Sequence, residues 1–250
     1  MSMKKTLSIA LATLMACSFA NATVKDLEKN LVKQYPASNF SNIEETKIKG
    51  IYEVTLGKNI AYTDVAGKYF LFGNMVDMAT QTDLTAEKRE ALDKVEFNKL
   101  PFDKAIKMVK GKGERQIAVF SDPDCPFCKR LEQEIQKLDN VTVYIFLNPL
   151  KQLHPKAIDI SKQIWCSKDR GEAWKDYMLG GIAPTATTTC DNPVDETVRL
   201  AQRMGFTGTP MSVLVDGTKI MGAKSASELD YALTRSTEKA NQAKKTKPKK

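Results

Sequence analysis

Two cysteines, Cys125 and Cys128, form the motif with the clearest chemical potential in this 250-residue chain. An apolar run at residues 117–120 precedes them and predicts a short buried strand, and residues 129–138 show helical periodicity. Pro126 suits the first turn of that helix, where its missing N–H leaves no hydrogen bond unmade. Unpaired N–H groups at the helix start would favour a Cys125 thiolate, and Cys128, one turn on, could form a disulfide with it. This layout is typical of a redox dithiol.

A Cys-x-x-Cys pair is also half of a zinc site, or a purely structural bridge. Zinc usually has four ligands, most often a second pair of cysteines or two histidines. The chain has one histidine, His154, and its late cysteines, Cys166 and Cys190, are far apart in the sequence. We therefore predict no metal and no other cofactor, and we favour the redox dithiol over both alternatives.

The first 22 residues have the features of a secretory signal peptide. Two early lysines precede an apolar segment at residues 7–16, and a small-x-small cleavage pattern ends at Ala22. We expect export to an oxidising compartment and cleavage between Ala22 and Thr23. A competing interpretation makes this segment a lipoprotein signal, with Cys17 lipidated. No later stretch reaches the roughly 18 apolar residues of a membrane-spanning helix.

Removal of this segment takes Cys17 from the five cysteines and leaves an even number in an oxidising compartment. Three pairings are then possible, and Cys125–Cys128 with Cys166–Cys190 is the natural one because the first pair is local. The second bridge would close a loop of about 25 residues, worth about 3.5 kcal/mol in the chain-entropy model. We interpret it as structural, while the first pair cycles between its redox states.

The net charge of +8 does not indicate nucleic-acid binding. The signal segment removes two lysines, and most of the remaining excess lies from residue 234 onward, so the folded body is nearly neutral. Residues 237–250 are rich in lysine and poor in apolar residues, and this composition predicts a disordered tail. We expect no nucleic-acid partner, whereas weak attachment of the tail to an anionic membrane surface stays open.

The remaining chain predicts an α+β protein with two folded parts. Residues 23–82 predict a helix and a small antiparallel meander, which has open strand edges and little core, so we expect dimerisation there. Residues 83–112 predict a charged linker helix that ends at a Gly-Lys-Gly joint. Residues 113–236 predict a strand, the Cys-x-x-Cys helix, a second strand, three helical stretches, a β-hairpin and a closing helix. That order is a thioredoxin-like α/β domain with a helical insertion.

These motifs resemble the DsbC/DsbG family of periplasmic thiol–disulfide isomerases, most closely its DsbC branch. The resemblance covers nearly the whole chain after the signal segment. Its matching features are the Cys-x-x-Cys after a strand, Gly208-Thr209-Pro210 before the hairpin, residues 164–169 with the later Cys190, and residues 62–78. The dipeptide inside the motif is Pro126-Phe127 here, where DsbC typically has Gly-Tyr and DsbG has Pro-Tyr.

The resemblance implies a cystatin-like N-terminal dimerisation domain and a chaperone-like cleft in the dimer. It implies that Cys125 attacks substrate, that Cys128 resolves the mixed disulfide, and that a cis bond before Pro210 lets the Thr209 backbone hold an extended substrate. The implied partners are mis-oxidised exported proteins and a DsbD-like membrane thiol reductase. The implied activity is protein disulfide isomerisation. The alternatives are a DsbG-like reductase of oxidised single cysteines and a holdase chaperone without redox turnover.

Two residues near the motif receive ordinary structural interpretations. Asp124 is expected to cap the helix that follows it. His154 is expected to be a loop residue.

Overall fold

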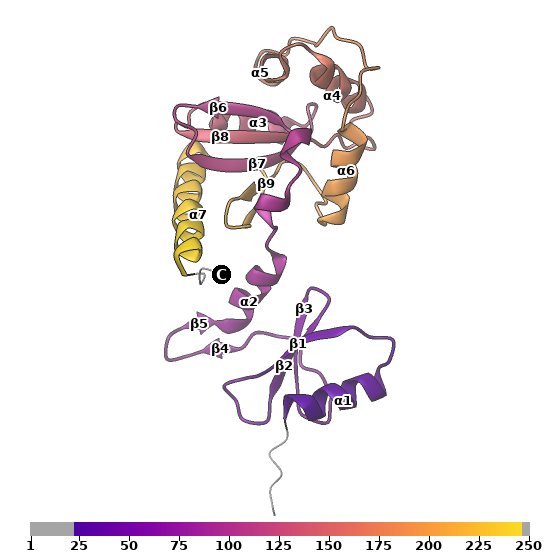
Figure 1. The fold of residues 1–250 in the computed structure, drawn as a ribbon, viewed down its shortest axis with the longest axis vertical. Helices are drawn as coiled ribbons and strands as arrows, with labels where there is room; N and C mark the ends of the chain where they lie inside the picture. Colours follow the sequence, from indigo (N-terminus) through magenta and orange to yellow (C-terminus); the bar gives the residue numbers. More distant parts are fainter. Residues whose placement is uncertain (1–22, 247–250) are drawn as a thin grey trace, which may run out of the picture. The chain divides into compact units, whose positions relative to one another are not determined.

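The structure is a computed structural model that describes residues 23–246. The chain divides into two compact units, with the boundary between Arg89 and Glu90, and Figure 1 shows the elements of each. The predicted signal peptide, with its lipoprotein alternative at Cys17, lies outside the described residues, as do residues 247–250. Within the described part, no helix is both long enough and apolar enough to cross a membrane.

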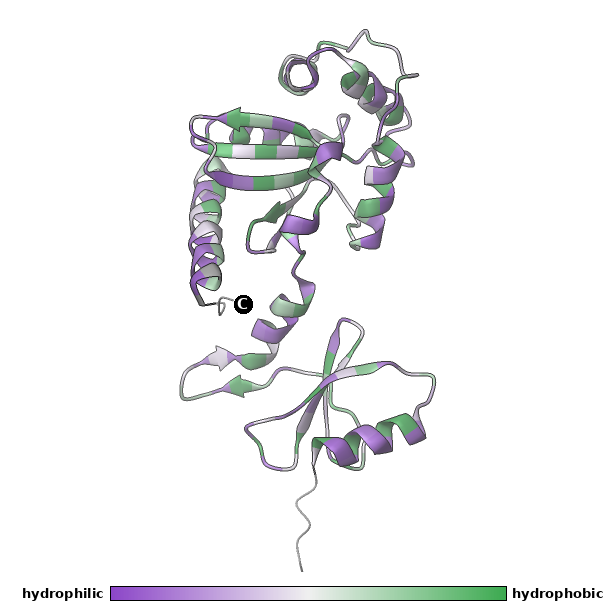
Figure 2. Cartoon of the chain, viewed as in Figure 1, coloured by the Kyte–Doolittle hydropathy of each residue, from purple (hydrophilic) through white to green (hydrophobic). Residues whose placement is uncertain are grey.

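The first unit begins with helix α1 (Val24–Gln34). Thr23 and Asp26 form a capping box, in which each side chain accepts from the other residue's backbone N–H, and this fixes the helix start. Leu27 and Leu31 are buried, and Figure 2 shows hydrophilic and hydrophobic residues together along α1. The helix therefore covers the adjoining sheet with one apolar side.

That sheet is antiparallel throughout and has the strand order β1–β2–β3. Its strands are β1 (Phe40–Glu45), β2 (Tyr52–Leu56) and β3 (Asn59–Thr63). A ribbon of β4 (Val76–Asp77) and β5 (Thr82–Asp83) leads into helix α2 (Leu84–Asp93). The helix-plus-sheet organisation predicted for this part of the chain is confirmed.

Helix α2 starts as part of the first unit. Asp83 Oδ1 accepts from the Ala86 N–H at 2.9 Å and caps the helix. Thr85 is fully buried, and its hydroxyl accepts from the Met75 N–H at 2.7 Å. These bonds secure the first turn of α2 to the segment that precedes it.

The second unit is built on a five-stranded sheet of order β10–β9–β7–β8–β6. Its strands are β6 (Ile106–Lys110), β7 (Arg115–Ser121), β8 (Val141–Leu147), β9 (Met211–Leu214) and β10 (Lys219–Met221). Its helices are α3 (Pro126–Ile135), α4 (Ala157–Cys166), α5 (Arg170–Gly180), α6 (Val194–Arg203) and α7 (Ala226–Thr246), with short 3-10 helices η1 (Phe97–Lys99) and η2 (Phe102–Lys104). β7 and β8 are parallel, and the other neighbours are antiparallel. The thioredoxin-like expectation is confirmed, with α4–α6 as the helical insertion.

The central strand β7 is buried on both faces, and alternate side chains serve two cores. Ile117 and Val119 belong to a cluster with side chains of α3, α5 and α7. Ala118 and Phe120 face the other way and pack with residues of η1, β9 and α6. This double burial explains why the strand reads as a continuous apolar run in the sequence.

The predicted linker helix at residues 83–112 is wrong in its second half. α2 ends at Asp93, two 3-10 helices follow, and β6 pairs antiparallel with β8 as an edge strand of the large sheet. The second unit therefore starts before residue 106 and not at residue 113. β6 has only five residues with alternating burial, so its strand pattern is too short to stand out before Gly111.

The predicted disorder from residue 237 is also wrong for the described residues, because α7 continues to Thr246. Ser236 is buried, and its hydroxyl donates to Asp216 Oδ1 at 2.8 Å in the β9–β10 hairpin. The strong helix formers Lys, Ala, Glu and Gln make up seven of the ten residues at 237–246. Tertiary anchoring and local propensity thus extend a helix that the charge pattern alone did not predict.

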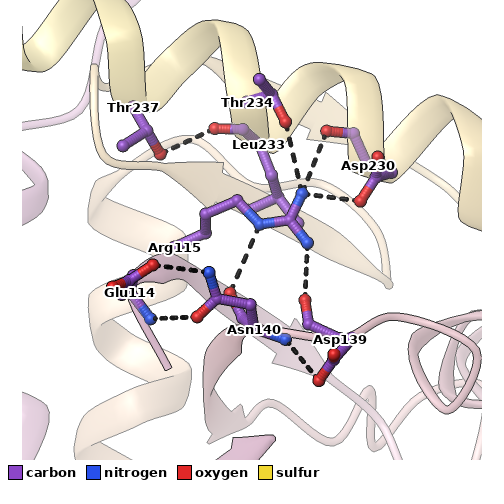
Figure 3. Close-up of polar contacts among 8 residues, drawn as sticks. All are labelled: Glu114, Arg115, Asp139, Asn140, Asp230, Leu233, Thr234 and Thr237. Carbon is purple, nitrogen blue, oxygen red and sulfur yellow. Dashed lines mark hydrogen bonds and ion pairs between the residues drawn. The ribbon is translucent and has the colours of Figure 1, made fainter. Parts of the chain in front are cut away.

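Arg115 ties α7 to the sheet, as Figure 3 shows. Its guanidinium donates to Asp230 Oδ1 at 2.6 Å, to Thr234 Oγ1 at 3.3 Å, and to the carbonyl oxygens of Asp139 at 2.5 Å and Asn140 at 3.3 Å. The Arg115 side chain is only 16% exposed. One side chain therefore connects the start of β7, the turn before β8 and the middle of α7.

Replacement of Arg115 by Ala should lower the free energy of unfolding by about 2–3 kcal/mol, because several backbone acceptors lose a charged donor. Urea unfolding followed by far-UV circular dichroism measures the change. Arg235→Ala is the matched control, since Arg235 lies on the same helix in an exposed pair with Glu238 and should change stability by less than about 0.5 kcal/mol. Equal effects of the two substitutions would show that the Arg115 contacts do not stabilise the fold.

Candidate active site

Cys125 occupies the N-cap position of α3, with φ −75° and ψ 123°. Its carbonyl oxygen accepts from the N–H groups of Cys128 and Lys129 at 3.0 and 3.1 Å, and Pro126 is the first helical residue. The Cys125 side chain therefore lies at the positive end of the helix dipole. The local sequence sets this position, because proline is tolerated at the first residue of a helix but not in its interior, so the helix starts at Pro126.

Both thiols of the motif are free, and both are shielded from solvent. Cys125 is 5% exposed and Cys128 is 1% exposed. The Asp122 N–H donates to Cys128 Sγ at 3.4 Å. Phe127, between the two cysteines, points outward and is 60% exposed. The site is thus a reduced dithiol with an aromatic residue exposed beside it.

The two thiols have opposite acidities. The hydrogen bond from the Cys128 thiol, with the backbone N–H groups of Cys128 and Phe127, outweighs burial and lowers the pKa of Cys125 to about 5. Burial, followed by that same bond to Cys125, raises the pKa of Cys128. At neutral pH the site therefore holds a thiolate at Cys125 and a proton on Cys128.

Thr209 and Pro210 lie beside Cys125, although they are far from it in the sequence. β9 pairs antiparallel with β7, with Met211 opposite Phe120, so the start of β9 lies near the end of β7. The Thr209–Pro210 peptide bond is cis, as the resemblance led us to expect. Cys125 Sγ lies 3.5 Å from the Thr209 carbonyl oxygen. The sheet register therefore brings a backbone polar group to the thiol.

Cys166 and Cys190 form a disulfide with a Cα–Cα distance of 5.8 Å. It joins the last residue of α4 to the segment before α6. This is the pairing that the sequence analysis favoured, and it leaves Cys125 and Cys128 as the free pair. The bridge fixes the helical insertion and takes no part in the dithiol.

One charged residue near the motif differs from expectation, and a second is buried. Asp124 does not cap α3, since Cys125 holds that position; its carboxylate instead accepts from the Tyr177 hydroxyl of α5 at 2.5 Å. Glu132 is 2% exposed, and it accepts from Trp174 Nε1 at 3.0 Å. Burial raises the pKa of Glu132. No short-range pattern shows these contacts, because both partners come from the helical insertion.

His154 is a loop residue, as expected, but the loop lies at the active site. Its Nδ1 is 2.9 Å from Asp122 Oδ2, and Asp122 directly precedes the turn that carries Cys125. Asp122 is completely buried. In the sequence, the sign of this contact is Asp122 itself, because an acidic residue directly after a buried apolar strand needs a polar partner. Within residues 23–246, no group of three or more His, Cys, Asp or Glu side chains could hold a metal ion.

The alkylation of Cys125 by iodoacetamide should follow its thiolate fraction, rising through a midpoint near pH 5 to a plateau. Because the pKa is lowered, the thiolate is lost only as the pH falls through that value. In Cys128→Ala the midpoint should move upward, since the thiol that donates to Cys125 is absent. Rate measurements with mass spectrometry of the labelled peptide test both statements. First labelling at Cys128, or a midpoint near the ordinary 8.5, would contradict this assignment.

Comparison with known proteins gives two matching family models. Residues 102–236 match a thioredoxin-like domain, and residues 18–86 match a disulfide bond isomerase protein N-terminal domain. The two matches cover the two units of the structure separately. They account for most of the described chain.

Similar proteins agree with this assignment. A DsbC thiol:disulfide interchange protein of Bordetella pertussis is 36% identical over 217 residues, which is 85% of this chain and 77% of the relative. DsbC of Escherichia coli K12 is 28% identical over 225 residues, covering 88% and 92% of the two chains. The crystal structure of a disulfide interchange protein from Neisseria gonorrhoeae has a TM-score of 0.54 and 45% identity, covering 55% of this chain and 99% of that one. The chain therefore belongs to the DsbC family of thiol:disulfide interchange proteins and is a thiol–disulfide oxidoreductase.

Proposed function

We propose that the protein is a disulfide isomerase, in which Cys125 is the attacking nucleophile and Cys128 the resolving thiol. The observation that carries this proposal is the unequal placement of the two thiols, with Cys125 at the N-cap of α3 and Cys128 buried one turn on. This placement lowers the pKa of Cys125 and raises that of Cys128. The proposed substrates are mis-oxidised exported proteins in the periplasm. The signal-like segment of the sequence and the family support this compartment.

The reaction begins when the Cys125 thiolate attacks one sulfur of a substrate disulfide. A mixed disulfide forms, and the other substrate sulfur leaves as a thiolate. A second substrate thiolate can then attack the sulfur bonded to Cys125, which forms a new substrate disulfide and restores the Cys125 thiolate. If rearrangement stalls, Cys128 loses its proton and attacks Cys125, which reduces the substrate and leaves Cys125–Cys128 oxidised.

The lowered pKa favours departure of the enzyme more than its attack. Relative to a thiol of pKa 8.5, about 3% ionised at pH 7, the Cys125 thiolate fraction rises about 30-fold. Its intrinsic nucleophilicity falls by a comparable factor, because reactivity decreases with basicity along a slope of about 0.4–0.5. The net gain lies in the leaving step, since a weakly basic thiolate is readily displaced from a mixed disulfide. Repeated reshuffling needs that property.

Thr209 and Pro210 are the proposed substrate-binding residues. The Thr209 carbonyl lies at the Cys125 sulfur, so an extended peptide could pair with this backbone while its disulfide meets the thiolate. The exposed Phe127 ring offers an apolar contact beside it. The backbone pairing is independent of side-chain identity, which suits an enzyme for many substrates.

The first unit is the proposed dimerisation domain. Its core consists of a few side chains of α1, β2 and β3, too few for a strongly stable separate fold. Large apolar side chains after β3 are exposed, namely Tyr69, Leu71, Phe72 and Met78. A homodimer would cover open strand edges and form a chaperone-like cleft for unfolded chains. A DsbD-like membrane thiol reductase is the proposed source of electrons that keeps Cys125 and Cys128 reduced.

Cys125→Ser should abolish the refolding of a scrambled multi-disulfide substrate, whereas Cys128→Ser should still attack and should accumulate mixed disulfides. Recovery of substrate activity and non-reducing mass spectrometry measure the two effects. Rapid reduction of a protein sulfenic acid with little rescue of the scrambled substrate would instead favour a DsbG-like reductase. Full activity of the Cys125→Ser/Cys128→Ser double variant in an aggregation assay, with no redox turnover of the wild type, would favour a holdase.

A fragment of residues 90–250 should fold as a monomer, because it contains both large core clusters and the whole five-stranded sheet. It should keep its iodoacetamide reactivity and lose most isomerase activity. Sedimentation of the fragment beside the full chain tests the oligomeric state. A dimeric fragment, or a full-length monomer that isomerises normally, would refute the assignment of dimerisation to the first unit.

A further inference from the structure

His154, the one histidine of the chain, contacts a carboxylate that has no access to solvent. Its Nδ1 lies 2.9 Å from Asp122 Oδ2, and its backbone N–H donates to the Leu150 carbonyl at 2.8 Å. The imidazole is 24% exposed and the Asp122 side chain is 0% exposed. The imidazole can therefore exchange protons with water, while the carboxylate remains enclosed.

Asp122 connects this imidazole to both thiols. Its N–H donates to Cys128 Sγ at 3.4 Å, and its carbonyl oxygen accepts from the Cys125 N–H at 3.2 Å. Its carboxylate also accepts from the Leu150 N–H at 2.7 Å. One buried residue thus fixes a donor to one thiol, the turn that presents the other, and the loop that carries His154.

The groups that face His154 are mainly negative. Asp122 and Asp124 lie between β7 and α3, and Cys125 begins α3. All three raise the pKa of His154 above its ordinary value, and the hydrogen bond to Asp122 is the largest cause. Tyr177 of α5 donates to Asp124 and Lys129 of α3 lies over the Tyr177 ring, while the exposed Lys151 and Lys156 lie within three residues of His154 in the sequence.

We propose that His154 is a positioning residue of the dithiol, whose imidazolium holds Asp122 and binds its proton more tightly when Cys125 is a thiolate. This inference rests on the proposed function, because it requires Cys125 and Cys128 to interconvert between dithiol and disulfide. It adds to that function that His154 takes up a proton when the Cys125–Cys128 disulfide is reduced. The imidazolium supplies the positive charge that a buried carboxylate beside a thiolate requires.

The proton balance of the couple follows from the groups involved. Reduction of the Cys125–Cys128 disulfide takes two electrons and one proton, giving a thiolate at Cys125 and a thiol at Cys128. When His154 is neutral in the oxidised protein and protonated in the reduced one, the same two electrons bring a second proton, which the solvent supplies to the imidazole. The two electrons come from the proposed DsbD-like thiol reductase, and no further co-reactant is needed.

The sign of the pH effect is set by the new negative charge. A thiolate at Cys125 favours imidazolium, so the pKa of His154 is higher in the reduced protein than in the oxidised one. Both values lie above the usual 6.5, because Asp122 is present in both states. Below both values, and above both, no extra proton is taken up. Between them, the reduction potential falls more steeply with pH.

Nuclear magnetic resonance gives a direct test, because the full chain has a single histidine signal. The imidazole Cε1–H resonance is followed against pH in the dithiol and in the disulfide form. The expected result is a midpoint above 6.5 in both forms and a higher midpoint in the dithiol. The same midpoint in both forms would overturn the proposal.

Reduction potentials measured in glutathione buffers between pH 6 and 9 supply the second test. A one-proton, two-electron couple changes its equilibrium constant tenfold per pH unit, or 29.6 mV, and the wild type should exceed this slope between the two His154 midpoints. His154→Asn keeps a donor to Asp122 without ionising and should return to the one-proton slope. Lys156→Gln, which removes an exposed cation two residues away, is the matched control and should keep the wild-type slope.

His154→Asn should also reduce the acidity constant of the Cys125 thiol about three- to tenfold, by the linkage that raises the His154 pKa. Unchanged thiol acidity with an unchanged pH slope would show that His154 only packs in the loop. Absence of a reversible Cys125–Cys128 disulfide in the wild type would instead refute the proposed function. The two failures are therefore distinguishable, and His154→Asn retains a side-chain donor for Asp122.

Discussion

The site depends on a shared hydrogen bond, in which one thiol keeps its proton so that its neighbour can lose one. Cys128 is enclosed by the core beneath α3, where a charge would be poorly solvated. Cys125 is one turn away at the helix N-terminus, where unpaired N–H groups and the helix dipole accept a charge. The three-residue spacing thus places one thiol where the protonated form is favoured and the other where the thiolate is favoured. The rest of the unit maintains that difference.

The sheet is the means by which the difference is maintained. β7 delivers Cys125 from a strand whose two faces serve separate cores, so the strand cannot shift register without exposing one of them. β9 fixes the Thr209 backbone beside the thiol through its pairing with β7. The insertion adds a second set of supports, because Tyr177 holds Asp124 and Trp174 holds Glu132. The reactive thiol and the Thr209 backbone lie at the ends of strands and helices, and the packing of those elements fixes their positions.

The elements that could be predicted from sequence are those with a strong local pattern. The apolar run of β7, the Cys-x-x-Cys helix start and the Gly-Thr-Pro turn all have such patterns, and they define the centre of the site. β6 was missed because five alternating residues beside a glycine-rich joint resemble a linker. The second half of α7 was missed because its lysines suggested disorder, although Ser236 anchors the helix on the hairpin.

Contacts between distant segments could not be predicted for a different reason. Glu132 follows the polar pattern of α3, yet Trp174 comes from the inserted helices and encloses it. His154 lies 32 residues from Asp122, and only the parallel pairing of β7 with β8 brings the two loops to the same sheet edge. Local propensity carries no information about such partners. Tertiary pairing must be known first.

The Cys166–Cys190 bridge has a consequence for the biogenesis of the protein. This thiol–disulfide oxidoreductase must acquire a disulfide of its own before its inserted helices are covalently fixed. Its maturation therefore needs an oxidant, while its working pair must be spared or re-reduced afterwards. Under the proposed function, newly made molecules would depend on the oxidative pathway whose errors they later correct. Molecules made in a reducing compartment would hold the insertion by packing alone.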